Sequence, residues 1–234
     1  MSLLIVGGNG FVGSAAAKYA VRQGIKVYSL SRRGPPSVME DWNEKVEYVQ
    51  GDAMDKTTYA NLVKECTGVI HTVGVLFDSK FKFKNEYKGS YEQMNRDSAI
   101  EVAETLRGTK KHFVYLSSER GIFFSPRYIS TKRDVEYWLQ NNSKDIVSSV
   151  LCPGYQYTAS HRGTQILGGI LNILNTKDWL FDKVGWQTGK DLFSPARSIS
   201  VDAVGKAAVL CAMRDEFKGR TLDVNAIEEI SINY

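Results

Sequence analysis

The sequence predicts an α/β fold built on a doubly wound parallel sheet, with a small C-terminal lobe. Two observations predict this class. Strand and helix patterns alternate in short units through residues 3–151, and such crossovers give parallel strands with helices on both faces. The first strand, 3–6, also runs directly into a glycine-rich turn that opens a helix. We therefore expect a Rossmann-type architecture.

The glycine-rich turn spans residues 7–13 and has the sequence GGNGFVG. Gly7 and Gly10 allow a tight turn with no Cβ beside a ligand, and Gly13 lets the helix pack close to its strand. Backbone N–H groups and the positive end of the helix dipole then point at one spot, where a pyrophosphate fits. The turn predicts dinucleotide binding, with a purely structural βα turn as the alternative. Further candidate contacts in it are Asn9, Phe11 and Val12.

The remaining elements follow from short apolar runs that end in turn residues. Strands are expected at 3–6, 26–30, 46–49, 69–73, 112–116 and 146–151, the last stopped by a Pro-Gly pair. Helices are expected at 11–23, 57–65, 91–106 and 128–140. In the first of these, the small residues 15–17 suit close packing on a sheet.

After residue 154 the regular alternation ends. A helix at 164–174, an aromatic stretch through Trp179, Phe181 and Trp186, a helix at 201–213 and a strand at 221–224 are expected to form a lobe over the cofactor. We therefore divide the chain into a nucleotide-binding domain, 1–154, and a small substrate or partner lobe, 155–234, integrated in the same fold.

Composition limits the function classes. The 234-residue chain is 43% hydrophobic and 24% charged, as in soluble globular proteins, and its formal charge of +4 is too small to argue for nucleic acid. No apolar run reaches the length of a membrane span. The three cysteines and three histidines show no metal-ligand spacing, so no metal is expected. The first strand starts at Leu3, so we expect no N-terminal targeting segment, which favours the cytosol or an internally targeted matrix protein.

The second strand ends in Ser31-Arg32-Arg33. An NAD-preferring protein usually has a carboxylate here to hold the ribose hydroxyls. A hydroxyl and two guanidiniums suit the additional 2′-phosphate of NADP instead. The pattern predicts NADP(H), with a solvated basic turn as the alternative.

Other candidate cofactor contacts lie where the remaining strands end. Parallel sheets of this type bind their ligand outside the carboxyl ends of the strands. Asp52 is placed to accept a hydrogen bond from the adenine amino group; as the alternative, it caps the next helix. The other candidates at these ends are Ala53, Val73, Gly74, Pro153 and Gly154.

Tyr128 and Lys132 are one helical turn apart, so they share a face. A phenol has a pKa of about 10 in water, and a nearby ammonium together with a cationic nicotinamide favours the phenolate and lowers that pKa. We expect Tyr128 and Lys132 to line the nicotinamide site, with Ser117 holding a carbonyl oxygen. Ser118 is the neighbouring alternative.

The glycine motif, Ser117 and the Tyr128/Lys132 pair together resemble the short-chain dehydrogenase/reductase superfamily, in its atypical or extended branch. Asn95 and residues 199–204 extend the resemblance toward the C-terminus. Within that branch, residues 8–13, 31–34, 91–95 and 128–133 are similar to a mitochondrial group. This group contains the NADPH-holding accessory subunit of respiratory complex I and short fungal members of the coenzyme Q biosynthetic complex.

The resemblance implies an NADP(H)-binding protein of coenzyme Q (ubiquinone) biosynthesis, on the matrix side of the mitochondrial inner membrane. It implies either an oxidoreductase acting on a small or quinone-like substrate, or a non-catalytic NADPH-holding subunit with protein partners. In the catalytic alternative, Tyr128 is the acid, Lys132 tunes it and orients the ribose, and Ser117 positions the carbonyl. Where family members often have Arg-Pro-Gly, this chain has Cys152-Pro153-Gly154, and its C-terminal part is short. Both departures argue against carrying over a sugar-modifying activity.

Two aromatic stretches fall outside these motifs. Residues 81–84 alternate phenylalanine with lysine, which suits either a solvated loop or a contact with a membrane surface or partner. Trp179, Phe181 and Trp186 suit either the core of a small lobe or an apolar substrate pocket.

Overall fold

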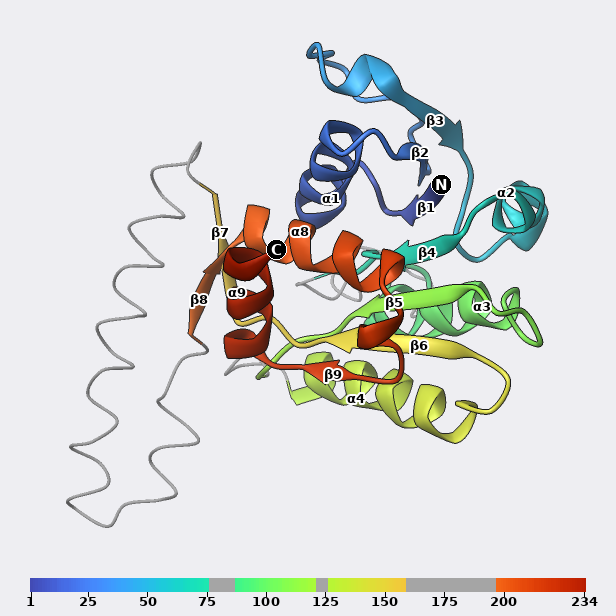
Figure 1. The fold of residues 1–234 in the computed structure, drawn as a ribbon. Helices are drawn as coiled ribbons and strands as arrows, with labels where there is room; N and C mark the ends of the chain where they lie inside the picture. The colour runs from blue at the N-terminus through green and yellow to red at the C-terminus, as the bar shows by residue number, and fades with distance from the viewer. Residues whose placement is uncertain (76–86, 121–125, 159–196) are drawn as a thin grey trace.

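The structure is a computed structural model that describes residues 1–75, 87–120, 126–158 and 197–234 (Figure 1). A seven-stranded sheet has the order β3-β2-β1-β4-β5-β6-β9, and every neighbouring pair in it is parallel. Its strands are β1 (Ser2–Val6), β2 (Lys26–Ser31), β3 (Val46–Gln50), β4 (Gly68–His71), β5 (His112–Leu116), β6 (Val147–Leu151) and β9 (Thr221–Leu222). The chain winds outward from β1 to β3 and then returns to β4, so the predicted doubly wound sheet is confirmed.

Helices cover both faces of the sheet. One face packs against α1 (Phe11–Arg22), α8 (Val201–Met213) and α9 (Val224–Asn233) (Figure 1). The other packs against α2 (Ala60–Glu65), α3 (Ser98–Glu104) and α4 (Pro126–Asn141). None of the helices in the described residues is both long and apolar enough to cross a membrane.

Strand β1 shows why the sheet needs two helical layers. Leu3 and Ile5 pack into the core beneath α1 and α8, whereas Leu4 and Val6 pack into the opposite core. All four side chains are essentially inaccessible to solvent. Because alternate side chains of a strand face opposite ways, an unbroken apolar run is stable only between two covered faces.

The helix starts follow from local chemistry. Gly7 has a φ of +87°, a left-handed conformation that favours glycine, and it reverses the chain after β1. The Ser200 hydroxyl accepts a hydrogen bond from the Asp202 N–H at 3.2 Å, which caps α8. Asp223 caps α9 in the same way, through the Ala226 N–H at 2.8 Å.

The expected helix at 91–106 has two parts. Residues Glu92–Asp97 form a π-helical segment, η4, which continues into α3. A π-helical turn has an extra residue per hydrogen-bonded ring, and such turns are frequent at functional sites. Short 3₁₀ segments η1 (Asn43–Lys45), η2 (Lys56–Thr58) and η5 (Asp215–Phe217) complete the connections.

The described C-terminal residues, 197–234, are part of the main fold, because β9 is the seventh strand of the main sheet and α8 packs against α1. The division of the chain at residue 154 stays a prediction. Helix α9 and the short parallel pair β7 (Tyr155–Tyr157) and β8 (Ser198–Ser200) were not predicted, whereas the predicted bounds of α8 are confirmed. The expected helix at 164–174, the three aromatic residues after it and the stretch 81–84 lie outside the described residues.

Helices α1 and α8 approach closely at Gly205. A Cβ added to Gly205 would lie 2.7 Å from both the carbonyl carbon of Ala15 and the backbone nitrogen of Ala16. These are backbone atoms, so the helices would have to move apart to admit a methyl group.

We therefore expect Gly205→Ala to destabilise the fold by about 1–3 kcal/mol, as overpacking does. An exposed helical glycine would show the opposite sign, with a gain of about 1 kcal/mol. Urea unfolding of the two proteins measures the difference. An unchanged or higher midpoint for Gly205→Ala would contradict this close contact.

Candidate functional site

A groove of about 750 Å³ opens beside the glycine-rich turn. It lies at the carboxyl ends of β1, β2, β3 and β4, where the winding direction of the sheet reverses. The predicted cofactor residues that line it are Gly7, Asn9, Gly10, Ser31, Arg32, Arg33, Asp52, Ala53, Val73 and Gly74. These residues come from four separate segments of the chain, and the fold brings them together at one edge of the sheet.

The glycine-rich turn leaves open space at the start of α1. The Gly7 N–H donates to the Leu30 carbonyl at 2.9 Å, and the Gly10 N–H donates to the Gly7 carbonyl at 2.8 Å. A Cβ on Gly10 would approach only the Gly7 carbonyl oxygen, at 3.0 Å. The first N–H groups of a helix have no partner inside it, so this end of α1 can bind an anion that fits the space.

Gly13 has a different role in the same turn. A Cβ there would overlap the Gly7 carbonyl and lie 2.8 Å from the Gly8 Cα. The absence of a side chain therefore lets the first turn of α1 rest against the backbone that follows β1. Gly13, Phe11 and Val12 are not among the residues that line the groove. Whether these three contact a cofactor stays a prediction.

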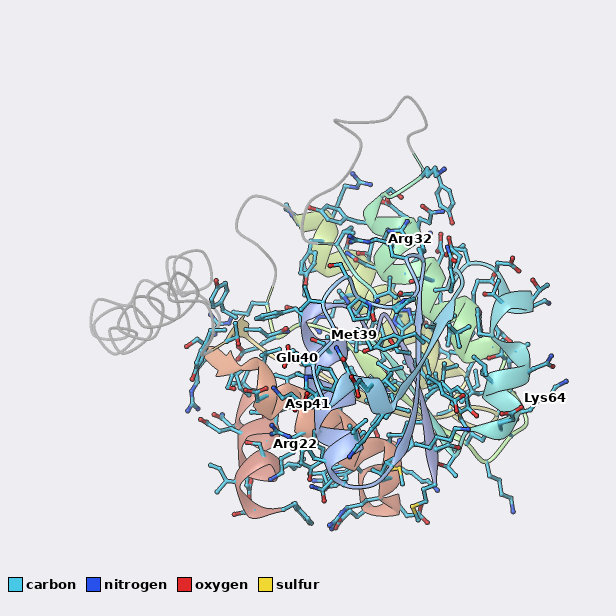
Figure 2. All side chains as sticks on the ribbon, turned by 90° about the horizontal axis from the view of Figure 1, so that it is seen from above. Arg22, Arg32, Met39, Glu40, Asp41 and Lys64 are labelled. Carbon is cyan, nitrogen blue, oxygen red and sulfur yellow. The ribbon has the colours of Figure 1, made fainter. Side chains whose placement is uncertain are left out.

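The basic turn after β2 borders the groove. Arg32 and Arg33 are exposed, and neither guanidinium forms an ion pair with any residue in the described ranges (Arg32 is labelled in Figure 2). No carboxylate follows β2 directly. The two positive charges are therefore available to an anionic ligand at this end of the groove.

Asp52 closes the turn after β3. Its Oδ1 accepts from the Met54 N–H at 3.0 Å, and the next helical segment, η2, is capped instead by Asp55 through the Thr57 N–H at 3.0 Å. The alternative that Asp52 caps this helix is therefore wrong. Asp52 and Ala53 face the groove, as the adenine assignment requires.

Lys132 lies at the carboxyl end of β5. Its side chain is 4% exposed, and Nζ donates to the Leu116 carbonyl at 2.8 Å. A Cβ on Gly74 would come within 3.4 Å of the same nitrogen. Burial lowers the pKa of Lys132 to about 8, although the Glu136 carboxylate opposes this shift.

Tyr128 lies one helical turn before Lys132 on α4. Its ring packs edge-to-face against Tyr91, with 5.9 Å between the ring centroids. Burial raises the pKa of Tyr128, and a side-chain hydrogen bond with Ser118 opposes the rise. Burial therefore has the larger effect on this pKa in the structure, and the expected lowering, which involves a bound nicotinamide as well as the ammonium, stays a prediction. Neither Tyr128 nor Lys132 lines the groove itself.

The two serines after β5 point to different partners. The Ser117 hydroxyl is buried and donates to the Glu136 carboxylate. Ser118 donates to the Arg120 carbonyl at 2.9 Å, and its interaction with the phenol opposes the rise in the pKa of Tyr128. The structure therefore brings Ser118, rather than Ser117, next to the phenol.

Cys152 directly follows β6, at the position where the resemblance described above implies an arginine. Its thiol lies 3.9 Å from Glu136 Oε1 and 4.0 Å from Arg133 Nη1, and burial raises its pKa to about 11. Arg133 therefore supplies a positive charge beside the thiol. At Gly154 a Cβ would overlap the Arg197 carbonyl, so the pairing of β7 with β8 accounts for the glycine. A cofactor contact of Pro153 or Gly154 stays a prediction.

Asn95 is a structural residue of the site that the sequence analysis left without a role. It is fully buried, and its Oδ1 accepts from the Val75 N–H at 2.7 Å. Its backbone carbonyl accepts from the Tyr115 hydroxyl at 3.0 Å. Asn95 therefore ties η4 to the segment after β4. In the sequence, Asn95 was noted only because it is one of the residues that resemble the family motif.

Several residues that line the groove were not among the predicted site residues. Ser98 lines the groove and lies 3.2 Å from His71 Nε2 through its hydroxyl oxygen. His71 is fully buried, and burial, together with the charge of Lys132, lowers its pKa to about 3. No cluster of potential metal ligands occurs among the described residues. Other unpredicted lining residues include Thr72, Val75 and Met94.

The contact between Ser118 and Tyr128 predicts a titration. A hydrogen bond to the phenolate favours it, so Ser118→Ala should raise the pKa of Tyr128 further. Ser117→Ala is the matched control, because that hydroxyl binds Glu136. Tyrosine ring carbons followed by NMR across the alkaline range, with Tyr128→Phe for assignment, report the shift. A response to Ser117→Ala alone would reverse the assignment of the serines.

Known proteins resemble this chain at the level of both sequence and fold. The sequence model of the NAD dependent epimerase/dehydratase family matches residues 3–123. MIOREX complex component 2 of Saccharomyces cerevisiae is 27% identical over an alignment of 277 positions, gaps included. The alignment covers 97% of this chain and 98% of that protein.

Two solved structures share the fold. A short-chain dehydrogenase/reductase family oxidoreductase from Burkholderia thailandensis has a TM-score of 0.66 at 15% identity, covering 95% of this chain and 90% of the other. UDP-glucose 4-epimerase from Thermus thermophilus, solved with NAD, has a TM-score of 0.64 at 16% identity, covering 99% and 81%. At these identities the likeness concerns the fold alone.

Proposed function

This chain belongs to the NAD dependent epimerase/dehydratase family, and from that premise we propose that it is an NADP(H)-binding dehydrogenase/reductase-like protein of mitochondrial coenzyme Q biosynthesis. The observation that carries the cofactor assignment is the groove at the carboxyl edge of the sheet. The glycine-rich turn lies at one side of the groove, and two arginines lie at the other. Neither arginine forms an ion pair with a carboxylate of the described residues. A dinucleotide with a 2′-phosphate fits this distribution of space and charge.

The residues present suit this cofactor in two respects. Gly7 and Gly10 leave the space that pyrophosphate oxygens would occupy at the start of α1. Arg32 and Arg33 offer planar, charge-assisted contacts to a phosphate. The Thermus thermophilus epimerase was solved with NAD, which supports a nicotinamide dinucleotide; the choice of NADP(H) rests on the basic turn.

The proposed chemistry is reduction or oxidation of a small or quinone-like carbonyl substrate. When bound, the cofactor supplies or accepts the hydride. Because burial raises its pKa, the Tyr128 phenol stays protonated at neutral pH and can donate a proton to a carbonyl oxygen. Lys132 would orient the ribose, and Ser118, the neighbour of Ser117, would hold the carbonyl oxygen.

The pathway and the compartment rest on resemblance. The chain has the motifs of the mitochondrial group described above, and it aligns over nearly its whole length with a yeast protein named as a complex component. We propose that it acts on the matrix side of the inner membrane, with protein partners. A cytoplasmic location is the alternative.

A second candidate function is a non-catalytic, NADPH-holding subunit of a mitochondrial complex. The name of the yeast relative favours this alternative, because it describes a component of an assembly. The same residues would hold the cofactor in both cases. In this alternative, the bound cofactor stabilises the folded state, as any ligand that binds only the native protein does.

Cofactor choice gives the first test. We expect the wild type to bind NADPH more tightly than NADH, and Arg32→Ala/Arg33→Ala to lose most of that preference. A hydrogen bond to a charged group contributes about 1.5–3 kcal/mol. Titration of intrinsic fluorescence with each cofactor gives both dissociation constants.

A matched control removes the same charge elsewhere. Arg22→Ala/Lys64→Ala takes two exposed positive charges from α1 and α2, and neither residue lines the groove (Figure 2). This variant should still bind NADPH more tightly than NADH if Arg32 and Arg33 act by direct contact with the cofactor. Equal affinity of the wild type for NADPH and NADH would overturn the NADP(H) assignment.

Genetic complementation separates the two candidate functions. A strain that lacks the protein should make less coenzyme Q or assemble the biosynthetic complex abnormally. Tyr128→Phe removes only a hydroxyl, so a stable, NADPH-loaded Tyr128→Phe protein should fail to rescue if Tyr128 is the acid. Full rescue would favour the accessory role. Normal coenzyme Q and complex assembly in the deletion strain would discard the pathway.

A further inference from the structure

The side-chain amide of Asn9 joins the two turns of the groove. Its Nδ2 donates to the Ser31 hydroxyl at 3.1 Å and to the Gly34 carbonyl, and its Oδ1 accepts from the Ser29 hydroxyl at 3.2 Å. These partners lie far from Asn9 in the chain, on β2 and on the basic turn after it. Asn9 therefore connects the glycine-rich turn directly to the segment that carries Arg32 and Arg33.

The orientation of this amide is determined by its partners. A backbone carbonyl can only accept, so the NH₂ group must face Gly34. The Ser31 hydroxyl donates its own hydrogen to the Gly34 carbonyl at 2.9 Å, which leaves its lone pair to accept from Asn9. Both amide hydrogens and the amide oxygen are thus used within the groove wall.

Packing brings the two segments into contact at the same place. Ser29 is fully buried, and a Cβ on Gly8 would overlap its hydroxyl oxygen. The glycine-rich turn therefore packs directly against the Ser29 side chain of β2, where a residue larger than glycine would not fit. Gly34 has a φ of +69°, so the basic turn also includes a left-handed residue at the point that Asn9 binds.

Few other contacts restrain the basic turn. Among the described residues, the Gly51 N–H donates to the Ser31 carbonyl at 3.0 Å, and Gln50 donates from its exposed amide to the Arg32 carbonyl at 3.2 Å. Both come from the far side, at the end of β3. Asn9 supplies the restraint from the pyrophosphate side, so it sets the spacing between the two ends of the groove.

We propose that Asn9 is a positioning residue for cofactor choice, which holds Arg32 and Arg33 at the distance from the glycine-rich turn that a 2′-phosphate requires. This inference rests on the proposed binding of NADP(H). NADPH and NADH share the pyrophosphate, and only NADPH has the 2′-phosphate. A displaced basic turn therefore weakens NADPH binding selectively, because positioned charges bind better than mobile ones.

The test measures the ratio of dissociation constants, Kd(NADH)/Kd(NADPH), in the whole protein. Asn9→Leu keeps the approximate volume of the side chain but removes all three hydrogen bonds. We expect the ratio to fall about tenfold, the equivalent of one lost charge-assisted contact. Asn61→Leu, on the exposed surface of α2, is the matched control and should leave the ratio unchanged.

A second variant covers the case in which Asn9→Leu does not fold. Asn9→Asp has the same shape, but it places a carboxylate oxygen against the Gly34 carbonyl and a negative charge near the basic turn. It should lower the ratio at least as far as Asn9→Leu. Circular dichroism of each variant checks the fold before titration.

A double-mutant comparison shows whether Asn9 acts through the arginines. In the Arg32→Ala/Arg33→Ala background, Asn9→Leu should leave the already reduced ratio unchanged, since two changes to one contact are not additive. A further fall of equal size in that background would overturn the positioning role.

The outcomes distinguish this inference from the proposed function. A wild type without preference for NADPH overturns the NADP(H) assignment itself. A wild type that prefers NADPH, combined with variants at Asn9 that weaken both cofactors by the same factor, overturns only the positioning role. It would then show that Asn9 serves the pyrophosphate alone.

Discussion

The approach of helix α1 to the backbone after β1 is the constraint on which the site depends. Gly13 rests on the backbone of Gly7 and Gly8, where no side chain fits. This contact points the start of α1 at the place where the winding direction of the sheet reverses. Gly205 makes a second contact of this kind within the helical layer, because it brings α8 against α1. Two glycine contacts thus determine where the groove opens and how the sheet above it is covered.

The groove and the Tyr128/Lys132 region are two environments with opposite electrostatics. The basic turn beside the groove is exposed, so its charges are solvated until a ligand covers them. Lys132 and His71 are buried, and burial lowers the pKa of each, while it raises that of Tyr128. All three shifts favour neutral side chains. At a pKa of about 8, Lys132 still carries a positive charge at neutral pH, so this region keeps one buried cation.

The family places this chain among proteins that use a dinucleotide, whereas its individual features decide how such a ligand would be held. The match over residues 3–123 covers the strands and turns that make the groove. A cluster at the ends of β5 and β6 joins Ser117, Glu136, Arg133 and Cys152. The partly buried Glu136 carboxylate accepts a hydrogen bond from the Ser117 hydroxyl, so Ser118 is the serine beside Tyr128.

The sequence by itself determined the sheet, the glycine-rich turn and most of the groove. Apolar runs such as β1 and punctuating glycines are local signals, so the winding order and the groove residues at the strand ends could be predicted. Contacts between distant residues required the tertiary structure. Local pattern does not distinguish Ser117 from Ser118, and it did not show that β9 joins the main sheet. The hydrogen-bond partners of Asn9 could not be predicted from the sequence either. A single side-chain amide leaves no periodic pattern, and its hydrogen bonds depend on how β2 packs beside the glycine-rich turn.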